Sequence, residues 1–181
     1  MTTALGVAAL VALTGAAVYV AVSTGSLTLD TGIGRRTRPL PSRRVTIRAP
    51  RERVFDLVAL PYLSAQPPRA LRDKIEVLER GSDLVVAAHR TRLSLFTAVT
   101  VEAVRFERPE AVTFRLLRGP VPYVAERFSL VEDGDVTHLD YAGTLGTDFW
   151  WLGRAWGALV ARPWMCTVDA SLAELKEAAE R

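Results

Sequence analysis

The chain has 181 residues, 49% of them hydrophobic and 24% charged, which suits a folded domain with a further segment and excludes a disordered chain. The net charge of +3 is unevenly placed, because eight of the 23 basic residues but only two of the 20 acidic residues precede Val54. The rest of the chain is mildly acidic, which argues against a nucleic-acid-binding domain.

Residues 4–23 are predicted to form a transmembrane anchor, because no residue from Ala4 to Val22 carries a charge. A helix of this length spans about 28 Å, close to the thickness of the hydrocarbon core of a bilayer. Arginines follow this stretch and none precedes it, so the positive-inside rule predicts a single-pass membrane protein with its N-terminus outside and its C-terminal domain cytoplasmic. The alternative is a signal peptide, which would leave a secreted protein after cleavage.

Residues 24–42 are rich in arginine, proline and glycine and are predicted to be a linker with no fold of its own. A domain at residues 43–181 follows. It opens with a short strand at residues 43–48 and a helix that starts at Pro50, a residue suited to the first position of a helix. Pro61 is predicted to interrupt the chain soon afterwards.

The middle of this domain is predicted to be an antiparallel sheet. Apolar and polar residues alternate along several segments that are separated by turn residues such as Asp133-Gly134, a pattern typical of hairpins with one buried face. The segments are residues 75–79, 84–92, 96–106, 111–118, 124–131 and 136–145. With the first strand they predict a sheet of about six to seven strands.

The end of the chain is predicted to be one long helix that starts at Thr147 or Asp148 and lies across the sheet. Its apolar residues recur at steps of three and four, which defines one broad buried face. These residues are Leu152, Trp156, Val160, Trp164, Val168, Leu172, Leu175 and Ala179. Pro163 lies inside the run and is expected to kink the helix. The predicted fold class is therefore α+β.

This order of elements resembles the helix-grip fold of the START-like superfamily, also called SRPBCC, whose members include polyketide cyclases and dehydrases and lipid-transfer domains. The likeness covers residues 43–181. It is carried by Val45-Thr46-Ile47-Arg48-Ala49-Pro50, by Arg118-Gly119-Pro120 with Tyr123 and Phe128, and by Ser171-Leu172 with Leu175-Lys176. The resemblance implies a curved antiparallel sheet wrapped on the C-terminal helix, with a hydrophobic cavity between them. It does not fix a function, because the members include carriers, sensors and enzymes.

Glu126 is the most informative polar residue of the predicted sheet, because it shares a strand face with Val124 and Phe128. A carboxylate on an apolar face needs a partner or a raised pKa. Arg90 or Arg118 is a candidate partner, and the carboxylate is interpreted as a ligand anchor, as an acid or base, or as half of a structural ion pair. The predicted ligand-binding residues are Val86, Arg90, Phe114, Leu116, Glu126, Phe128, Tyr141, Trp151, Trp156, Val160 and Trp164.

Motifs for metal or nucleophilic chemistry are not found in the sequence. His89 and His138 are the only histidines and Cys166 is the only cysteine, so neither a metal-ligand spacing nor an internal disulfide is present. There is also no nucleophile elbow, phosphate loop or dinucleotide fingerprint. We therefore predict no metal and no cofactor, and we assign no catalytic residue.

The function expected from these features is membrane-anchored binding, transport or sensing of a small hydrophobic ligand, such as a lipid or a polyketide-like molecule. One alternative is a cyclase or dehydrase acting in the same cavity, where holding a flexible chain in a reactive conformation supplies much of the catalysis. Another is a protein-interaction module without a ligand. The predicted partners are the ligand and the membrane but not nucleic acid, and the oligomeric state is left open.

Overall fold

The computed structural model describes residues 2–92 and 96–181, and its centre is one seven-stranded antiparallel sheet in the order β1-β7-β6-β5-β4-β3-β2. The strands are β1 (Arg36–Ile47), β2 (Ile75–Arg80), β3 (Leu84–Arg92), β4 (Thr97–Glu107), β5 (Ala111–Arg118), β6 (Tyr123–Asp133) and β7 (Val136–Thr147). The helices are α1 (Thr2–Ser23), α2 (Arg51–Leu63), α3 (Arg69–Lys74) and α4 (Trp150–Ala179). The α+β prediction and the strand number are confirmed.

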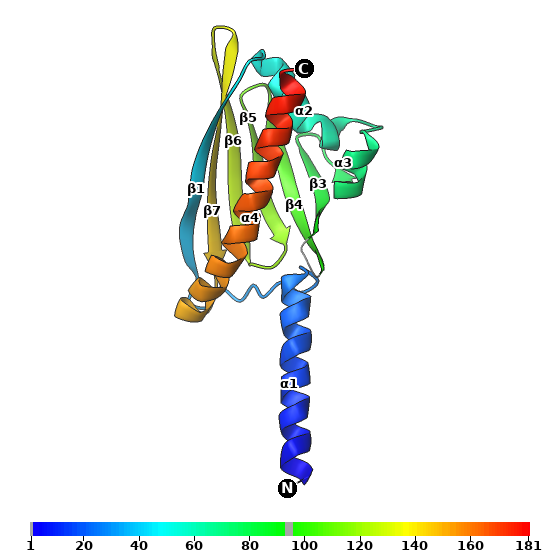
Figure 1. The fold of residues 1–181 in the computed structure, drawn as a ribbon, viewed down its shortest axis with the longest axis vertical. Helices are drawn as coiled ribbons and strands as arrows, with labels where there is room; N and C mark the ends of the chain where they lie inside the picture. The colour runs from blue at the N-terminus through cyan, green and yellow to red at the C-terminus, as the bar shows by residue number, and fades with distance from the viewer. Residues whose placement is uncertain (1, 93–95) are drawn as a thin grey trace.

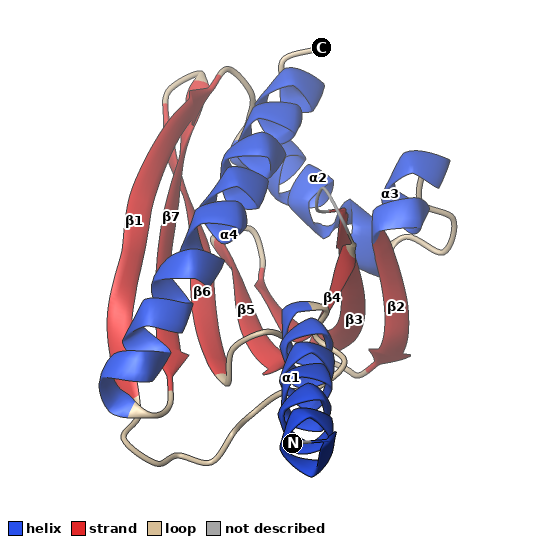
Figure 2. Cartoon of the chain, turned by 60° about the horizontal axis from the view of Figure 1, so that its bottom comes forward, coloured by secondary structure: helices blue, strands red, loops and turns tan. Residues whose placement is uncertain are grey.

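Helix α4 crosses the sheet diagonally, and α2 lies on the same side of the sheet (Figures 1 and 2). The face of the sheet that these helices cover, called the inner face below, carries most of the hydrophobic core. The largest fully buried side chains include Tyr141, Phe55, Ile47, Leu139, Leu145 and Val54. Gly157 brings α4 close to β7, because a Cβ at this position would lie 3.0 Å from the side chain of Thr147.

Strand β1 begins at Arg36, earlier than the strand predicted at residues 43–48. Its pairing with β7 shifts register between Leu40 and Arg43, and Pro39 and Pro41 lie beside this irregularity. Prolines are tolerated there because β1 is an edge strand. The structure therefore corrects the predicted linker, since its last residues belong to the sheet.

The chain between α1 and β1 is held against the domain by an interaction network that we call the Asp148 clamp. The carboxylate of Asp148 accepts hydrogen bonds from the backbone N–H groups of Thr31 (2.7 Å) and Gly32 (2.8 Å) and from Nε of Arg35 (2.7 Å). A further backbone bond joins Val99 N to the carbonyl of Thr24 at 2.9 Å. This segment is therefore ordered on the domain through polar contacts.

The predicted membrane anchor at residues 4–23 is not borne out. Among the residues that the structure describes, no helix combines the length and apolar character needed to cross a membrane. The predictions of a membrane partner and of a single-pass protein with a cytoplasmic domain are corrected accordingly.

We expect a fragment of residues 24–181 to melt cooperatively and at a higher temperature than a fragment of residues 43–181. The shorter fragment lacks the Asp148 clamp and the first half of β1, so it loses several buried hydrogen bonds. Thermal denaturation followed by circular dichroism measures the difference. Equal melting temperatures would show that the clamp adds nothing to the stability of the sheet.

Candidate functional site

The inner face of the sheet brings together the side chains that are able to take part in a reaction. Glu126 of β6 lies opposite Phe114 of β5, and Phe128 of β6 lies opposite Tyr141 of β7. Side chains alternate between the faces of a strand, so Glu126 and Phe128 point to the same side. Helix α4 covers this side with Trp164, which contacts Glu126 directly. The predicted apolar face of β6 is therefore the inner face.

The carboxylate of Glu126 is held through only one of its two oxygens. Tyr141 donates its hydroxyl to Oε1 of Glu126 at 2.5 Å, and Trp164 donates its indole N–H to the same oxygen at 2.8 Å. No hydrogen bond within the described part of the chain reaches Oε2. The two donors fix the orientation of the carboxyl group and leave Oε2 without a hydrogen bond from the described residues.

The environment of Glu126 also changes its acidity. Burial, together with the negative charge of Glu102, raises the pKa of Glu126 to about 7, although the hydrogen bonds from Trp164 and Tyr141 oppose the shift. Burial and the Glu126 charge raise the pKa of Tyr141, so its hydroxyl remains a donor. Both protonation states of Glu126 are therefore populated near neutral pH, which is the condition for an efficient acid or base.

A second polar cluster lies on β3, β4 and α2. Nδ1 of His89 is 3.0 Å from Oε2 of Glu102, and the hydroxyl of Thr100 donates to Oε1 of Glu102 at 2.8 Å. The hydroxyl of Tyr62 is 3.2 Å from Nε2 of His89. Both oxygens of Glu102 thus have partners, in contrast to those of Glu126.

The acidities in this cluster favour a charged pair. Burial disfavours the charge on Glu102, but the charge of His89 and the hydrogen bonds from His89 and Thr100 prevail and lower the pKa of Glu102. Burial likewise disfavours the charged form of His89, yet the adjacent Glu102 carboxylate raises the pKa of His89. Burial raises the pKa of Tyr62, so this group keeps its proton. Each pair partner thus stabilises the charge of the other.

Aromatic rings connect the two polar clusters. The ring centroids of Tyr62 and Phe114 are 5.9 Å apart, those of Phe114 and Phe128 are 5.5 Å apart, and those of Phe128 and Tyr141 are 5.2 Å apart. These spacings are typical of favourable aromatic pairs. Phe128, Trp164, His89 and Glu126 are only half-buried, so part of this surface remains accessible.

Most of the predicted ligand-binding residues lie on this side of the sheet or on the helix that covers it. These are Phe114, Leu116, Glu126, Phe128, Tyr141, Trp156, Val160 and Trp164. Val86 and Arg90 lie on the opposite face, because His89 and Ala87 are the inner residues of β3. Arg90 pairs with Glu76 rather than with Glu126.

Trp151 lies outside the site, because it projects from the first turn of α4 with 74% of its surface exposed. Arg118, the other predicted partner of Glu126, is also exposed. The structure therefore gives Glu126 two neutral donors where an arginine was expected.

Glu102 and Tyr62 are site residues that were not predicted from the sequence. The signal for Glu102 was present, because it shares its strand parity with Val104 and Phe106, the same argument that selected Glu126. Tyr62 was missed because α2 continues beyond Pro61, which was predicted to break it. This extra length carries Tyr62 into the interior, where 5% of its surface is exposed.

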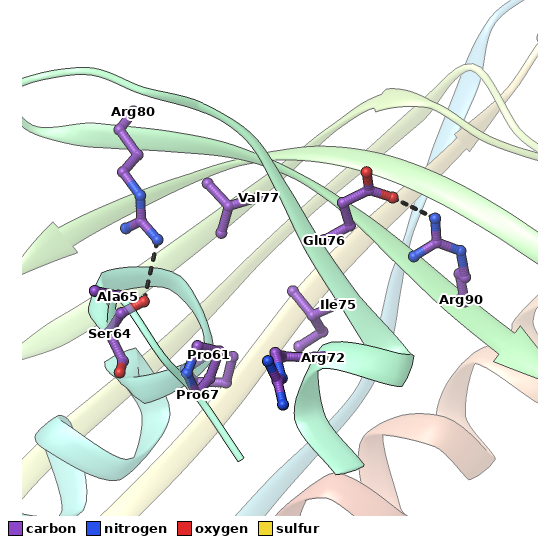
Figure 3. Close-up of a pocket in the computed structure, with 10 residues that line it drawn as sticks. All are labelled: Pro61, Ser64, Ala65, Pro67, Arg72, Ile75, Glu76, Val77, Arg80 and Arg90. Atoms are coloured by element: carbon purple, nitrogen blue, oxygen red, sulfur yellow. Dashed lines mark hydrogen bonds and ion pairs between the residues drawn. The ribbon is translucent and has the colours of Figure 1, made fainter. Parts of the chain in front are cut away.

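Two surface pockets lie apart from these clusters. The larger, of about 360 Å³, lies between the end of α2, α3 and the edge strand β2 (Figure 3). Ile75 and Val77 belong to its apolar lining. Arg80 donates a hydrogen bond to the backbone of Ser64, and Arg90 pairs with Glu76. Glu126 lines neither this pocket nor the second one, so the carboxyl group with the raised pKa lies outside both pockets.

A metal centre has no support from the described residues, none of which form a cluster of three or more His, Cys, Asp or Glu side chains suited to a metal ion. The groups available for chemistry are the Glu126 carboxyl and the Tyr62–His89–Glu102 chain. Proton transfer is the reaction type that these groups can support.

The comparisons with known proteins bear on the fold. The two-domain aromatase/cyclase BexL of the BE-7585A biosynthetic pathway matches with a TM-score of 0.64 and 18% identity over 80% of this chain and 50% of its own. The Zhui aromatase/cyclase from Streptomyces sp. R1128 gives a TM-score of 0.57 and 19% identity over 77% of this chain and 94% of its own. The chain has the helix-grip fold.

A helix-grip enzyme of a different kind is also similar. Truncated norcoclaurine synthase from Thalictrum flavum matches with a TM-score of 0.60 and 12% identity over 81% of this chain and 94% of its own. No protein-family model matches the chain, and the search of curated proteins found no match. The chain spans about half the length of BexL, which has two domains. These identities establish the shared helix-grip architecture alone.

Proposed function

We propose that the inner face of the sheet binds a small molecule with an apolar or aromatic body and that Glu126 exchanges a proton with it. The observation that carries this proposal is a carboxyl group whose pKa is raised by burial to about 7, with one oxygen held by Tyr141 and Trp164 and the other unengaged. The helix-grip proteins that it resembles in structure include aromatase/cyclases, which adds support.

The proposed chemistry is the dehydration of a β-hydroxy ketone, a step that also occurs when a ring becomes aromatic. The carboxylate of Glu126 removes the proton from the carbon beside the ketone, and the resulting carboxylic acid gives a proton to the departing hydroxyl. One C–H bond and one C–O bond break, a C=C bond forms, and water leaves. A single group performs both steps in turn because its pKa lies near the working pH.

The other groups of the site would position the substrate. Phe114 and Phe128 present ring faces and edges against which an aromatic or polyene body packs. Tyr141 and Trp164 keep Glu126 in one orientation through their hydrogen bonds. The Tyr62–His89–Glu102 chain provides a neutral hydroxyl donor at the far end of the aromatic row.

The test uses the aldol adduct of benzaldehyde and acetone, whose loss of water gives a strongly absorbing conjugated enone. We expect the full chain to accelerate this reaction and Glu126→Gln to reduce turnover by about a hundredfold or more, because the amide cannot accept the proton. Binding of the adduct, followed by quenching of tryptophan fluorescence, should change little. Glu132→Gln, on the exposed end of the same strand, is the matched control.

Two outcomes decide against the proposed chemistry. If the wild-type chain binds the adduct but releases no enone, the site is a binding site without this reaction. If Glu126→Gln and Glu132→Gln lower turnover equally, the reaction does not depend on the inner face. Native mass spectrometry of the chain purified from its source cells would then identify the molecule that it carries.

A further inference from the structure

A second pocket, of about 230 Å³, lies between the beginning of β1, the end of β7 and the first turns of α4. Its walls include three arginines, Arg36 and Arg38 from β1 and Arg154 from α4. Leu145 and Thr147 from β7 also line it. No acidic residue is among its lining residues, so its charge is strongly positive. We call it the arginine pocket.

The positive charge of this pocket is not neutralised by its surroundings. Within residues 2–92 and 96–181, none of the three arginines forms an ion pair. Asp148 follows Thr147 directly, but its carboxylate is occupied by the clamp with Thr31, Gly32 and Arg35. Three like charges that share one small pocket repel one another, and a bound anion would relieve this repulsion.

Arg38 supplies the second observation. Its side chain is half-buried, and one terminal nitrogen donates to the carbonyl oxygen of Gly157 at 2.9 Å. Its Nε atom is buried and has no hydrogen-bond partner among the residues that the structure describes. Buried donors without partners are rare in folded proteins, and each one calls for an explanation. An oxygen atom of a bound anion would satisfy this donor once the half-buried side chain of Arg38 turns toward the pocket.

We propose that the arginine pocket binds the phosphate group of a small organic phosphate. Guanidinium groups bind phosphate oxygens with paired hydrogen bonds, and a phosphate offers enough acceptor oxygens for three arginines. The aliphatic parts of the three arginine side chains give the organic part an apolar contact. This site lies apart from Glu126, so the proposal of phosphate binding does not depend on the proposed dehydration.

The test is isothermal titration calorimetry of the full chain with glycerol phosphate, with inorganic phosphate and with citrate, in a buffer that contains no phosphate. We expect both phosphates to bind, citrate to bind more weakly, and added salt to weaken the binding. Arg36→Gln and Arg154→Gln should each weaken glycerol phosphate binding by about tenfold, the effect of losing one charged hydrogen-bonding partner.

The matched control is Arg115→Gln, which removes the same charge from an arginine stacked on Tyr123, away from this pocket. It should leave the affinity unchanged. An equal loss in Arg115→Gln and Arg154→Gln would mean that only the overall charge attracts phosphate, which overturns the proposal. Tighter binding of citrate would overturn the assignment to phosphates, and the absence of heat with either phosphate would overturn the site itself.

Discussion

At about pH 8, we expect Glu126→Gln to raise the free energy of unfolding by about 3 kcal/mol. Burial raises the pKa of Glu126 from 4.5 to about 7, so between these values the folded chain keeps a proton that the unfolded chain has lost. A state that binds more protons loses stability as the pH rises. The wild-type protein should therefore become less stable between about pH 4.5 and pH 7, and the variant should not.

Urea denaturation at a series of pH values measures this effect. The amide oxygen of the variant can still accept hydrogen bonds from Tyr141 and Trp164, so the packing around residue 126 is preserved. Glu132→Gln, which changes an exposed carboxylate on the same strand, serves as the control. Parallel stability profiles for wild type and Glu126→Gln would show that Glu126 is not held in its neutral form, and would remove the basis of its proposed role.

We expect Asp148→Ala to lower the free energy of unfolding by about 3–5 kcal/mol, the range for removing one partner of a buried ion pair. Only 1% of the side chain of Asp148 is exposed, and its loss leaves the donors of Thr31, Gly32 and Arg35 without their acceptor. Asp30→Ala is the control, because Asp30 also pairs with Arg35 but is 58% exposed. Its effect should stay below about 1 kcal/mol.

The clamp also predicts a dependence on acid. Hydrogen bonds from Arg35 and from the backbone of Thr31 and Gly32 lower the pKa of Asp148 far below its ordinary value, despite its burial. A carboxylate with a lowered pKa stabilises the folded state above about pH 4, and this stabilisation is lost as the pH falls further. Wild type and Asp148→Ala should therefore converge in stability in acid. A constant difference down to the acid transition would contradict this account.

The sheet and its covering helix were predictable because their signals are local. Alternation of apolar and polar residues with hairpin turns gave six of the strands close to their observed positions, and the spacing of residues such as Val160 and Leu172 gave α4. The same alternation placed Glu126 on the inner face. Such patterns are repeated many times along the chain, so one ambiguous residue does not change the result.

The wrong assignments arose where apolar and polar residues do not alternate, or where the contact between two side chains depends on how their strands pair. Strand β3 contains four consecutive apolar residues, Val85, Val86, Ala87 and Ala88, so its sequence does not distinguish its inner face from its outer face. Arg90 was therefore placed on the wrong face. The contact of His89 with Glu102 joins diagonal positions of β3 and β4, because Ala87 lies opposite Glu102 and His89 lies opposite Thr100. Such a contact depends on strand register, which the sequence does not reveal.

The early part of the chain was misjudged for a different reason. Residues 24–35 dock through backbone hydrogen bonds and through Asp148, and contacts of this kind leave no hydrophobic periodicity to detect. Because this segment contains several glycines and is followed by prolines, its composition is that of a free linker. The Asp148 clamp nevertheless holds it in place.

The irregular edge strand β1 has a consequence for association between chains. An open sheet exposes unpaired backbone groups along its outer strands, and these can template pairing with another molecule. Pro39 and Pro41 provide no N–H groups for such pairing, and the register shift after Leu40 bends the edge that a second strand would have to follow. Arg36 and Arg44 add charge to the same strand. The chain is thereby protected against edge-to-edge aggregation along β1.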